Sequence, residues 1–164
     1  MTAKDGDGWV DCTCGQKHWG LFGAAGLALV VENKILLQHR APWVHNGDTW
    51  GIPGGARDSH ENVEESALRE ATEEIGIDSN KILVLEKFVD SHGMWSYTTI
   101  IATLKPGINS DLSELANNSL HNSETSNLSW VDIYQLDKLN LHPSFAKTWN
   151  ELLPELEKIF MELS

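Results

Sequence analysis

The sequence predicts an α/β (α+β) fold in which helices cover a mixed β-sheet, and three observations support this. The 164 residues match one ordinary domain, and their content of 41% hydrophobic and 22% charged residues is typical of a folded globular chain. Short β-rich runs alternate with two amphipathic helical stretches, the element order of a sheet packed against helices. Neither a repeat nor an interior linker divides the chain. We therefore expect one domain over residues 20–164, preceded by an irregular lead-in over residues 1–19.

The first half of the chain is expected to form strands. Leu21–Val31 is apolar but about half as long as a membrane span, and it lacks the basic flank of a signal peptide, so we interpret it as a buried strand. The pair Glu32-Asn33 is a polar hairpin signal. We expect Gly23–Val31 and Lys34–Arg40 to form a hairpin. A loop over Ala41–Thr49 should follow, and then a short strand that breaks into a tight turn over Trp50–Gly55.

The second half begins with a helix. Glu61–Ile75 has helical periodicity, and Gly76 stands where a left-handed residue ends a helix. Asp58 and Glu61 have the D-x-x-E spacing of a capping box. Three strands should follow, over Ile82–Asp90, Trp95–Leu104 and Leu128–Ile133. A loop rich in Asn and Ser is expected over Asn109–Asn127, and a second helix over Ser144–Leu153, which Pro154 ends or kinks.

Acidic residues outnumber basic ones by two to one. The 24 Asp and Glu against 12 Lys and Arg give a net charge of −12 and a pI near 4.8. This balance argues against a nucleic-acid binder or a binder of anionic membranes, which need a basic face. It is compatible with a phosphate substrate, because divalent cations invert the local sign of charge. Two cysteines are too few for a disulfide framework, so we expect a reducing, cytoplasmic location.

The predicted helix Glu61–Ile75 carries three carboxylates on one side. On a helical wheel, the three fall within an arc of roughly 100°, beside an apolar stripe: Glu70, Glu73 and Glu74, with Val63, Ala67, Leu68, Ala71 and Ile75 in the stripe. Two like charges about 4 Å apart repel by about 4 kcal/mol at an effective dielectric of about 20. Divalent cations with oxygen ligands relieve this repulsion. The alternative is a solvated acidic face paired with Arg69.

The residues around the three glutamates decide between a cation site and a solvated acidic face. The run from Gly55 to Ile77 resembles the Nudix box of Nudix hydrolases at every defined position, namely Gly55, Glu61, Arg69, Glu70, Glu73, Glu74, Gly76 and Ile77. Ala71 is smaller than the aliphatic residue usual there. The Pro-Gly-Gly entry and the flanking strands extend the resemblance over about residues 20–155. It implies a Nudix-type α/β/α sandwich, with residues 20–164 as the Nudix hydrolase domain.

The resemblance also implies a metal site and its supporting residues. Mg²⁺ or Mn²⁺ would be held by carboxylates and by the backbone carbonyl of Gly54, with a further acidic residue from a loop before a late strand: Glu70, Glu73, Glu74, Gly54 and Glu124. Glu124 lies six residues before Trp130, a spacing similar to that of MutT-like members, and Glu114 is the other acidic residue of that loop. Arg69 would orient the carboxylates. Glu61 would contact the metal site indirectly or, alternatively, cap the helix. The implied catalytic residues are Glu70, Glu73, Glu124 and Arg69.

The implied reaction is hydrolysis of a nucleoside diphosphate linked to another group. Signatures of enzymes that act on NADH, ADP-ribose and coenzyme A are missing, which leaves a MutT-like nucleoside triphosphate pyrophosphohydrolase as the leading interpretation. An ADP-ribose, nucleotide-sugar or dinucleotide pyrophosphatase stays open. So does a Nudix-fold regulator that binds nucleotide without turnover. The expected partner is a small nucleotide, and a homodimer is an open alternative to a monomer.

Weaker signals concern substrate contacts and zinc. Trp43 and Trp50 flank a loop where they could stack on a base, and Arg40 could hold a phosphate; a core position or a surface pair is the alternative. Trp130 and Trp149 are expected in the core. One cluster offers three of the four ligands that zinc normally takes: Cys12, Cys14 and His18. The alternative is a pair of ordinary thiols in a docked segment.

Overall fold

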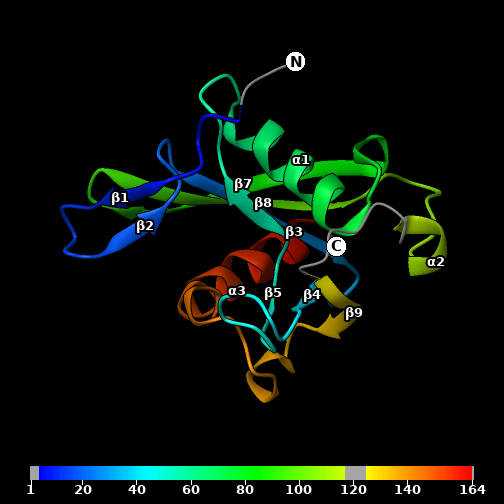
Figure 1. The fold of residues 1–164 in the computed structure, drawn as a ribbon. Helices are drawn as coiled ribbons and strands as arrows, with labels where there is room; N and C mark the ends of the chain where they lie inside the picture. The colour runs from blue at the N-terminus through cyan, green and yellow to red at the C-terminus, as the bar shows by residue number, and fades with distance from the viewer. Residues whose placement is uncertain (1–3, 117–124, 164) are drawn as a thin grey trace.

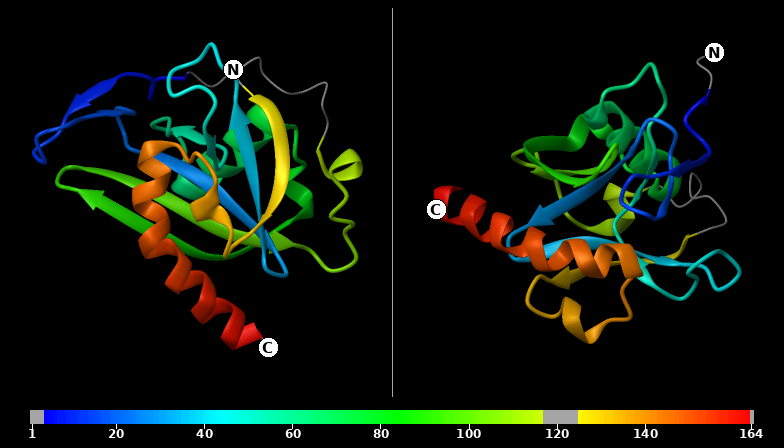
Figure 2. Two further views of the ribbon diagram at one scale, coloured as in Figure 1. Left: turned by 90° about the horizontal axis from the view of Figure 1, so that it is seen from below. Right: turned by 90° about the vertical axis from the view of Figure 1, so that its left-hand side faces the viewer.

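The computed structural model describes residues 4–116 and 125–163. A mixed sheet forms the middle layer, with α1 (Val63–Ile75) over one face and α3 (Pro143–Leu163) across the other (Figure 1). The two further views in Figure 2 show the same three layers. The predicted sandwich is therefore confirmed. No helix in these described ranges is long and apolar enough to cross a membrane.

Over the described ranges, the main sheet contains seven strands. They pair in the order β5-β4-β3-β8-β7, with β6 on β3 and β9 on β4. β3 and β8 run parallel, and the other pairs are antiparallel. The bounds are β3 Ala24–Val31, β4 Lys34–Arg40, β5 Trp50–Gly51, β6 Gly54–Ala56, β7 Ile82–His92, β8 Trp95–Leu104 and β9 Thr125–Asp132.

β3 is the central strand and contributes to both cores. Successive side chains of a strand point to opposite faces, so Leu27 and Leu29 pack towards α1 whereas Ala28 and Val30 pack towards α3. Each helix completes its core with an apolar face: Ala67, Ala71 and Ile75 from α1, and Phe145, Trp149, Leu152 and Leu156 from α3. The predicted core position of Trp149 is confirmed, and Trp130 is partly buried against the α1 core.

The start of α1 corrects one prediction. Asn62, not Asp58, caps the helix, and a capping box joins Asn62 to Glu65. Only half of the expected Asp58–Glu61 box forms, in which the Asp58 N–H donates to the Glu61 carboxylate. The Asp58 carboxylate instead accepts the Gly6 N–H, a tertiary contact that helical periodicity does not reveal. The predicted end is confirmed, because Gly76 is left-handed with φ 69° and its N–H donates to Thr72.

The later elements differ from expectation in two places. α3 continues through Pro154 to Leu163, so the expectation that proline ends it is wrong. Leu152 and Leu156 are fully buried on either side of the exposed proline, and this packing offsets the lost backbone hydrogen bond. The expected Asn/Ser-rich loop contains a short helix and the start of β9; the short helices are η1 Ser79–Lys81, α2 Leu112–Leu115 and η3 Leu136–Lys138.

A small hairpin lies within the segment expected to be irregular. β1 (Trp9–Asp11) pairs with β2 (Lys17–Trp19) as a separate two-stranded sheet. In Figure 1 this hairpin lies at the end of the main sheet where β7 and β8 meet. A contact between Cys12 of the hairpin and the backbone of His92 joins the two units.

Candidate functional site

Arg69 is the centre of a charged network on α1. Its Nε and Nη2 donate to the two carboxylate oxygens of Glu61, at 2.6 and 2.9 Å. Its Nη1 donates to Glu70 Oε1 at 3.0 Å and to Glu73 Oε2 at 3.2 Å. Its Nη2 also donates to the carbonyl of Ala56 in β6. A planar guanidinium suits such forked contacts, and the network fixes two of the three predicted glutamates relative to the sheet.

The proton affinities of this pair follow from its geometry. The Arg69 hydrogen bonds lower the pKa of the buried Glu61 carboxyl below its usual value, although burial alone would raise it. The Glu61 hydrogen bonds raise the pKa of Arg69 in turn. The two groups are therefore a permanent ion pair. Glu61 acts on the other carboxylates through the position that it gives to Arg69.

Glu74 lies on the same helix but inside the protein. Its side chain is only 8% exposed, and its Oε2 accepts the Gly54 N–H at 3.0 Å and a Gln38 amide N–H at 3.2 Å. Burial raises its pKa to about 8, and the charge of nearby Glu70 adds to this effect. Arg40 lowers the same pKa, which places its guanidinium within electrostatic reach of Glu74. Glu74 is thus a buried carboxyl that keeps its proton at neutral pH when no cation is near.

The Pro-Gly-Gly turn lies directly against these carboxylates. A Cβ on Gly55 would come within 2.7 Å of Glu70 Oε1, and one on Gly54 within 2.6 Å of the Ala25 carbonyl and of the Tyr97 hydroxyl. Only glycine permits this approach. Burial also raises the pKa of Glu70, and the charge of Arg69 opposes that shift. The turn therefore brings backbone of β6 against the carboxylates of α1.

We call Glu70, Glu73 and Glu74 the acidic face. Its donors are all oxygen, burial raises the pKa values of two of its carboxyls, and hard divalent cations suit such a set. The three carboxylates do not gather around one point in the described part of the chain. In the described ranges, the groups of three or more ligand atoms within 4.8 Å of one another are Cys12, Cys14 and His18, and Asp58, His60 and Glu61. The acidic face fits the predicted metal, provided that small side-chain movements draw its carboxylates together.

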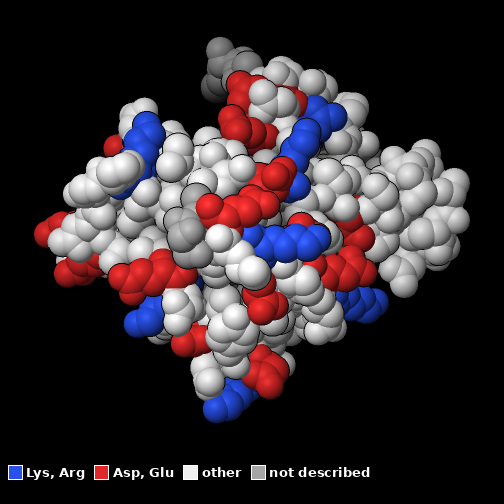
Figure 3. Space-filling model, turned by 180° about the vertical axis from the view of Figure 1, so that it is seen from behind, with Lys and Arg blue, Asp and Glu red and all other residues white. Residues whose placement is uncertain are grey.

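The N-terminal segment runs beside the acidic face. Lys4 Nζ lies 3.0 Å from Glu73 Oε1, and both side chains are partly exposed. Asp5 follows and accepts hydrogen bonds from the backbone and hydroxyl of Ser59. An ammonium group therefore stands beside one glutamate of the acidic face. Figure 3 shows acidic and basic side chains close together over the face opposite to the view of Figure 1.

The remaining predicted residues lie around the loop after β4. Arg40 donates two hydrogen bonds to the carbonyl of His45, Trp43 is 71% exposed, and Trp50 packs against the ring of His39. The Arg40 side chain is bonded to its own loop, and Trp43 lies in solvent. Glu124 lies outside the described residues.

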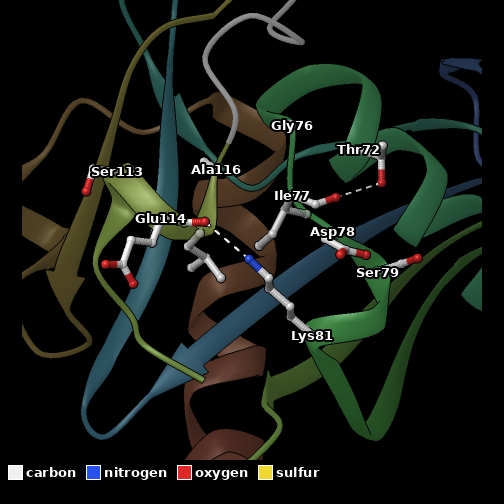
Figure 4. Close-up of a pocket in the computed structure, with 10 residues that line it drawn as sticks. Thr72, Gly76, Ile77, Asp78, Ser79, Lys81, Ser113, Glu114 and Ala116 are labelled. Carbon is white, nitrogen blue, oxygen red and sulfur yellow. Dashed lines mark hydrogen bonds between the residues drawn. The ribbon is translucent and has the colours of Figure 1, made fainter. Parts of the chain in front are cut away.

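A hollow near the C-terminal end of α1 is a separate feature (Figure 4). Lys81 reaches across it and donates to the backbone carbonyl of Glu114 at 3.2 Å, and Ile77 bridges to Ala116. Glu114, the other acidic residue of the Asn/Ser-rich stretch, lines this hollow. Thr72 and Gly76 line the same hollow, which lies past the last glutamate of the acidic face.

Two contacts of the site were missed at the level of sequence. Gln38, a buried polar residue in the apolar strand β4, bonds to Glu74; its place in an apolar run was an available signal. Lys4 contacts Glu73 across a long sequence separation, and no spacing rule indicates such a pair.

Comparisons with known proteins cover the same part of the chain. A family model described as the NUDIX domain matches residues 21–153. A Mycobacterium tuberculosis (strain H37Rv) protein named "Putative 8-oxo-dGTP diphosphatase 3" is 42% identical over 161 residues, which covers 90% of this chain and 69% of that protein. A Bifidobacterium longum nucleoside triphosphate pyrophosphatase/Nudix hydrolase fusion protein is 38% identical, and the match covers 95% of this chain and 33% of the fusion.

Solved structures agree with these matches. The crystal structure of a Nudix hydrolase from M. smegmatis, RenU, superimposes with a TM-score of 0.79 at 38% identity, covering 94% of this chain and 97% of that one. An Ap4A hydrolase from C. elegans gives a TM-score of 0.60 at 18% identity, over 82% of this chain and 98% of that one. The second likeness shows the shared fold alone.

Proposed function

The chain belongs to the Nudix family of hydrolases, which act on pyrophosphate bonds, and from this premise we propose that it is a MutT-like nucleoside triphosphate pyrophosphohydrolase that depends on Mg²⁺ or Mn²⁺. The observation that carries the proposal is the network in which Glu61 holds Arg69, and Arg69 holds Glu70 and Glu73. The 42% identity to a protein named as an 8-oxo-dGTP diphosphatase supports a triphosphate substrate.

The acidic face and the Gly54 carbonyl are the proposed cation ligands. Bound divalent ions would neutralise the charge of the pyrophosphate and lower the pKa of a bound water. Arg69 and Glu61 would keep the carboxylates of Glu70 and Glu73 directed at the cations. Glu74 would give up its proton on binding, because burial raises its pKa and a bound cation would stabilise the carboxylate.

Glu124 is proposed to bind a cation or to act as the general base, since its spacing to Trp130 is similar to that of MutT-like members. Glu124→Gln should lower kcat by about 10-fold to 10³-fold, the range of general-base effects. Glu114→Gln is the matched control from the same stretch, and we expect it to change kcat by less than about twofold, because Glu114 lines the hollow past the end of α1. A silent Glu124→Gln together with an impaired Glu114→Gln would reverse the assignment.

Arg40 and Trp43 are the proposed substrate contacts, and Trp50 is proposed to position their loop. Arg40 lies within electrostatic reach of Glu74, which suits a group that holds a phosphate beside the cations. Trp43 is exposed on the loop between β4 and β5 and is available to stack on a base. Trp50 packs into the α3 core as well as against His39, so its contribution is to position that loop.

A substrate panel with product identification tests the proposal. Nucleoside triphosphates including 8-oxo-dGTP, ADP-ribose, nucleotide sugars and dinucleotides would be assayed with Mg²⁺ and with Mn²⁺. We expect a triphosphate to have the highest kcat/KM and to yield a nucleoside monophosphate and pyrophosphate. Preference for ADP-ribose or a dinucleotide would contradict the substrate class. Nucleotide binding without any product would contradict the enzymatic role.

A further inference from the structure

The β1–β2 hairpin carries a cluster of possible metal ligands. Their donor atoms are sulfur and nitrogen, whereas those of the acidic face are oxygen. Cys12, Cys14 and His18 each place one ligand atom within 4.8 Å of the others. Cys14 Sγ lies 3.1 Å from His18 Nε2. In a tetrahedral zinc site with Zn–S of about 2.3 Å and Zn–N of about 2.0–2.1 Å, these two atoms would stand roughly 3.6 Å apart. Only a small opening of the pair is needed to admit an ion.

The backbone around the two sulfurs supports a bound thiolate. The Cys14 N–H points at Cys12 Sγ, with an N···S distance of 3.5 Å, and an N–H directed at sulfur stabilises negative charge there. Gly15 follows with φ 89°, a left-handed conformation that lets the chain turn back after the second cysteine. The Cys12 N–H donates to the Gln16 carbonyl and closes this turn. The turn therefore holds both sulfurs on one side.

His18 is held in place independently of the cysteines. Its ring stacks on Trp95 with centroids 4.2 Å apart and an interplanar angle of 8°. Trp95 is buried and its Nε1 donates to the Gly20 carbonyl at 2.9 Å. Stacking on a fixed indole leaves the imidazole little freedom, so its Nε2 is directed at Cys14 before any ion binds. Such preorganisation favours binding, because the ligand is already ordered.

The hairpin touches the main sheet at the turn between β7 and β8. A Cβ on Gly93 would come within 2.0 Å of Thr13 Oγ1 and 3.6 Å of Cys12 Sγ, so the two turns are in close contact. Cys12 also contacts the carbonyl of His92. The main-sheet side of this contact is a tight turn, and the hairpin side has only two strands of three residues each. A hairpin this small is marginal by itself.

From these contacts we propose that Cys12, Cys14 and His18 bind Zn²⁺, with water in the fourth position, and that the ion closes the turn of the N-terminal hairpin. Thiolate and imidazole donors select zinc over Mg²⁺, whereas the oxygen donors of the acidic face have the opposite preference. The chain would then hold two kinds of metal for two purposes: cations for hydrolysis on α1, and a structural zinc on the hairpin.

Metal content of the purified full chain tests the proposal. The reduced protein would be loaded with Zn²⁺ in excess Mg²⁺, desalted, and analysed by mass spectrometry. We expect about one zinc per chain for the wild type and for Gln16→Ala, an exposed control in the same hairpin, and at least a fivefold loss in Cys14→Ala and in His18→Phe. Phenylalanine keeps a ring against Trp95 and removes the ligand atom, so His18→Phe separates ligation from stacking.

Substitution by Co²⁺ gives a readout of the ligand type that does not depend on activity. The wild type should show the thiolate-to-cobalt charge-transfer band and the visible bands of tetrahedral coordination, and both should be absent from Cys14→Ala. Equal zinc content in wild type and Cys14→Ala would overturn the proposal. So would cobalt bound without a thiolate band, because the ion would then lie on oxygen ligands. Neither result bears on the proposed hydrolysis, which Glu73→Gln tests separately.

Discussion

The acidic face on α1 and the Cys12–Cys14–His18 group on the hairpin offer opposite solutions to holding a cation. The first uses hard oxygen donors on a long helix that is anchored in the core, with Arg69 as a built-in counter-charge. The second uses soft sulfur and nitrogen donors on a short turn, with an aromatic ring as its support. Each matches its donor type to a different ion.

The two regions also differ in how much unfavourable charge they hold when no cation is bound. Two carboxyls of the acidic face have raised pKa values, so the metal-free face holds unfavourable charge that protonation relieves. The hairpin group pairs Cys14 with His18 directly and needs no counter-ion. We therefore expect the carboxylates of the acidic face to lower the stability of the fold when no cation is bound. We expect zinc binding to raise the stability of the hairpin. Disabling one region should leave the other intact, and the following predictions rest on that independence.

The largest expected effect is on turnover. Glu73→Gln and Glu74→Gln should each lower kcat by about 10² or more, because each removes a proposed ligand charge and keeps the helix. Glu64→Gln, on the exposed first turn of the same helix, is the matched control and should be nearly silent. Steady-state rates at saturating Mg²⁺ decide the matter. If both variants keep normal rates, the acidic face is solvated surface.

Glu61→Gln should have the next largest effect, because it breaks the forked contact that holds Arg69. We expect the Mg²⁺ concentration for half-maximal rate to rise by about tenfold, as for other residues that position metal ligands. The free energy of unfolding should fall by about 1–3 kcal/mol, since Arg69 keeps Glu70 and Glu73 as partners. A loss of stability with an unchanged Mg²⁺ requirement would make Glu61 a purely structural residue.

The pH dependence of the metal-free protein follows from Glu74. Its pKa is about 8 in the folded state against 4.5 for the unfolded reference, so the folded protein keeps a proton that the unfolded chain loses. The contribution of Glu74 is greatest below pH 4.5 and is lost as the pH rises towards 8. In excess chelator, the melting temperature should therefore fall between pH 5 and 8, and Glu74→Gln should fall less. Parallel curves for the two proteins would refute the assignment.

The smallest expected effect concerns Lys4. Its ammonium contacts Glu73 in a partly exposed pair, and such pairs contribute at most about 1 kcal/mol. Lys4→Met should tighten Mg²⁺ binding by up to about threefold, because the cation no longer competes with the ammonium. The Kd for Mg²⁺, measured by calorimetry with the catalytic residues unchanged, should show this. A weaker affinity would instead mean that Lys4 supports the acidic face.

The sequence predicted most of the sheet because its strands are apolar or alternating. Lys34–Arg40 and Trp95–Leu104 are strands with the predicted bounds. Two errors arose where tertiary packing decides. The Asp58 carboxylate accepts the Gly6 N–H, and Asn62 caps the helix instead. The buried leucines on either side of Pro154 stabilise α3, which therefore continues beyond the proline. Neither contact leaves a periodic signal in the chain.

The candidate site was predictable where it depends on spacing along one helix. Glu61 and Arg69 stand eight residues apart, and the structure joins them by two hydrogen bonds. Contacts from other elements escaped prediction, because Gln38 and Lys4 approach α1 only after the sheet and the N-terminal segment have packed.

The dependence of turnover on a divalent cation tests the central claim most directly. Pyrophosphate release from the preferred triphosphate would be followed in excess EDTA and again after Mg²⁺ or Mn²⁺ is added beyond the chelator. We predict no release in EDTA and full recovery with either cation, accompanied by a rise in melting temperature from binding to the folded state. Undiminished pyrophosphate release in EDTA would contradict the account.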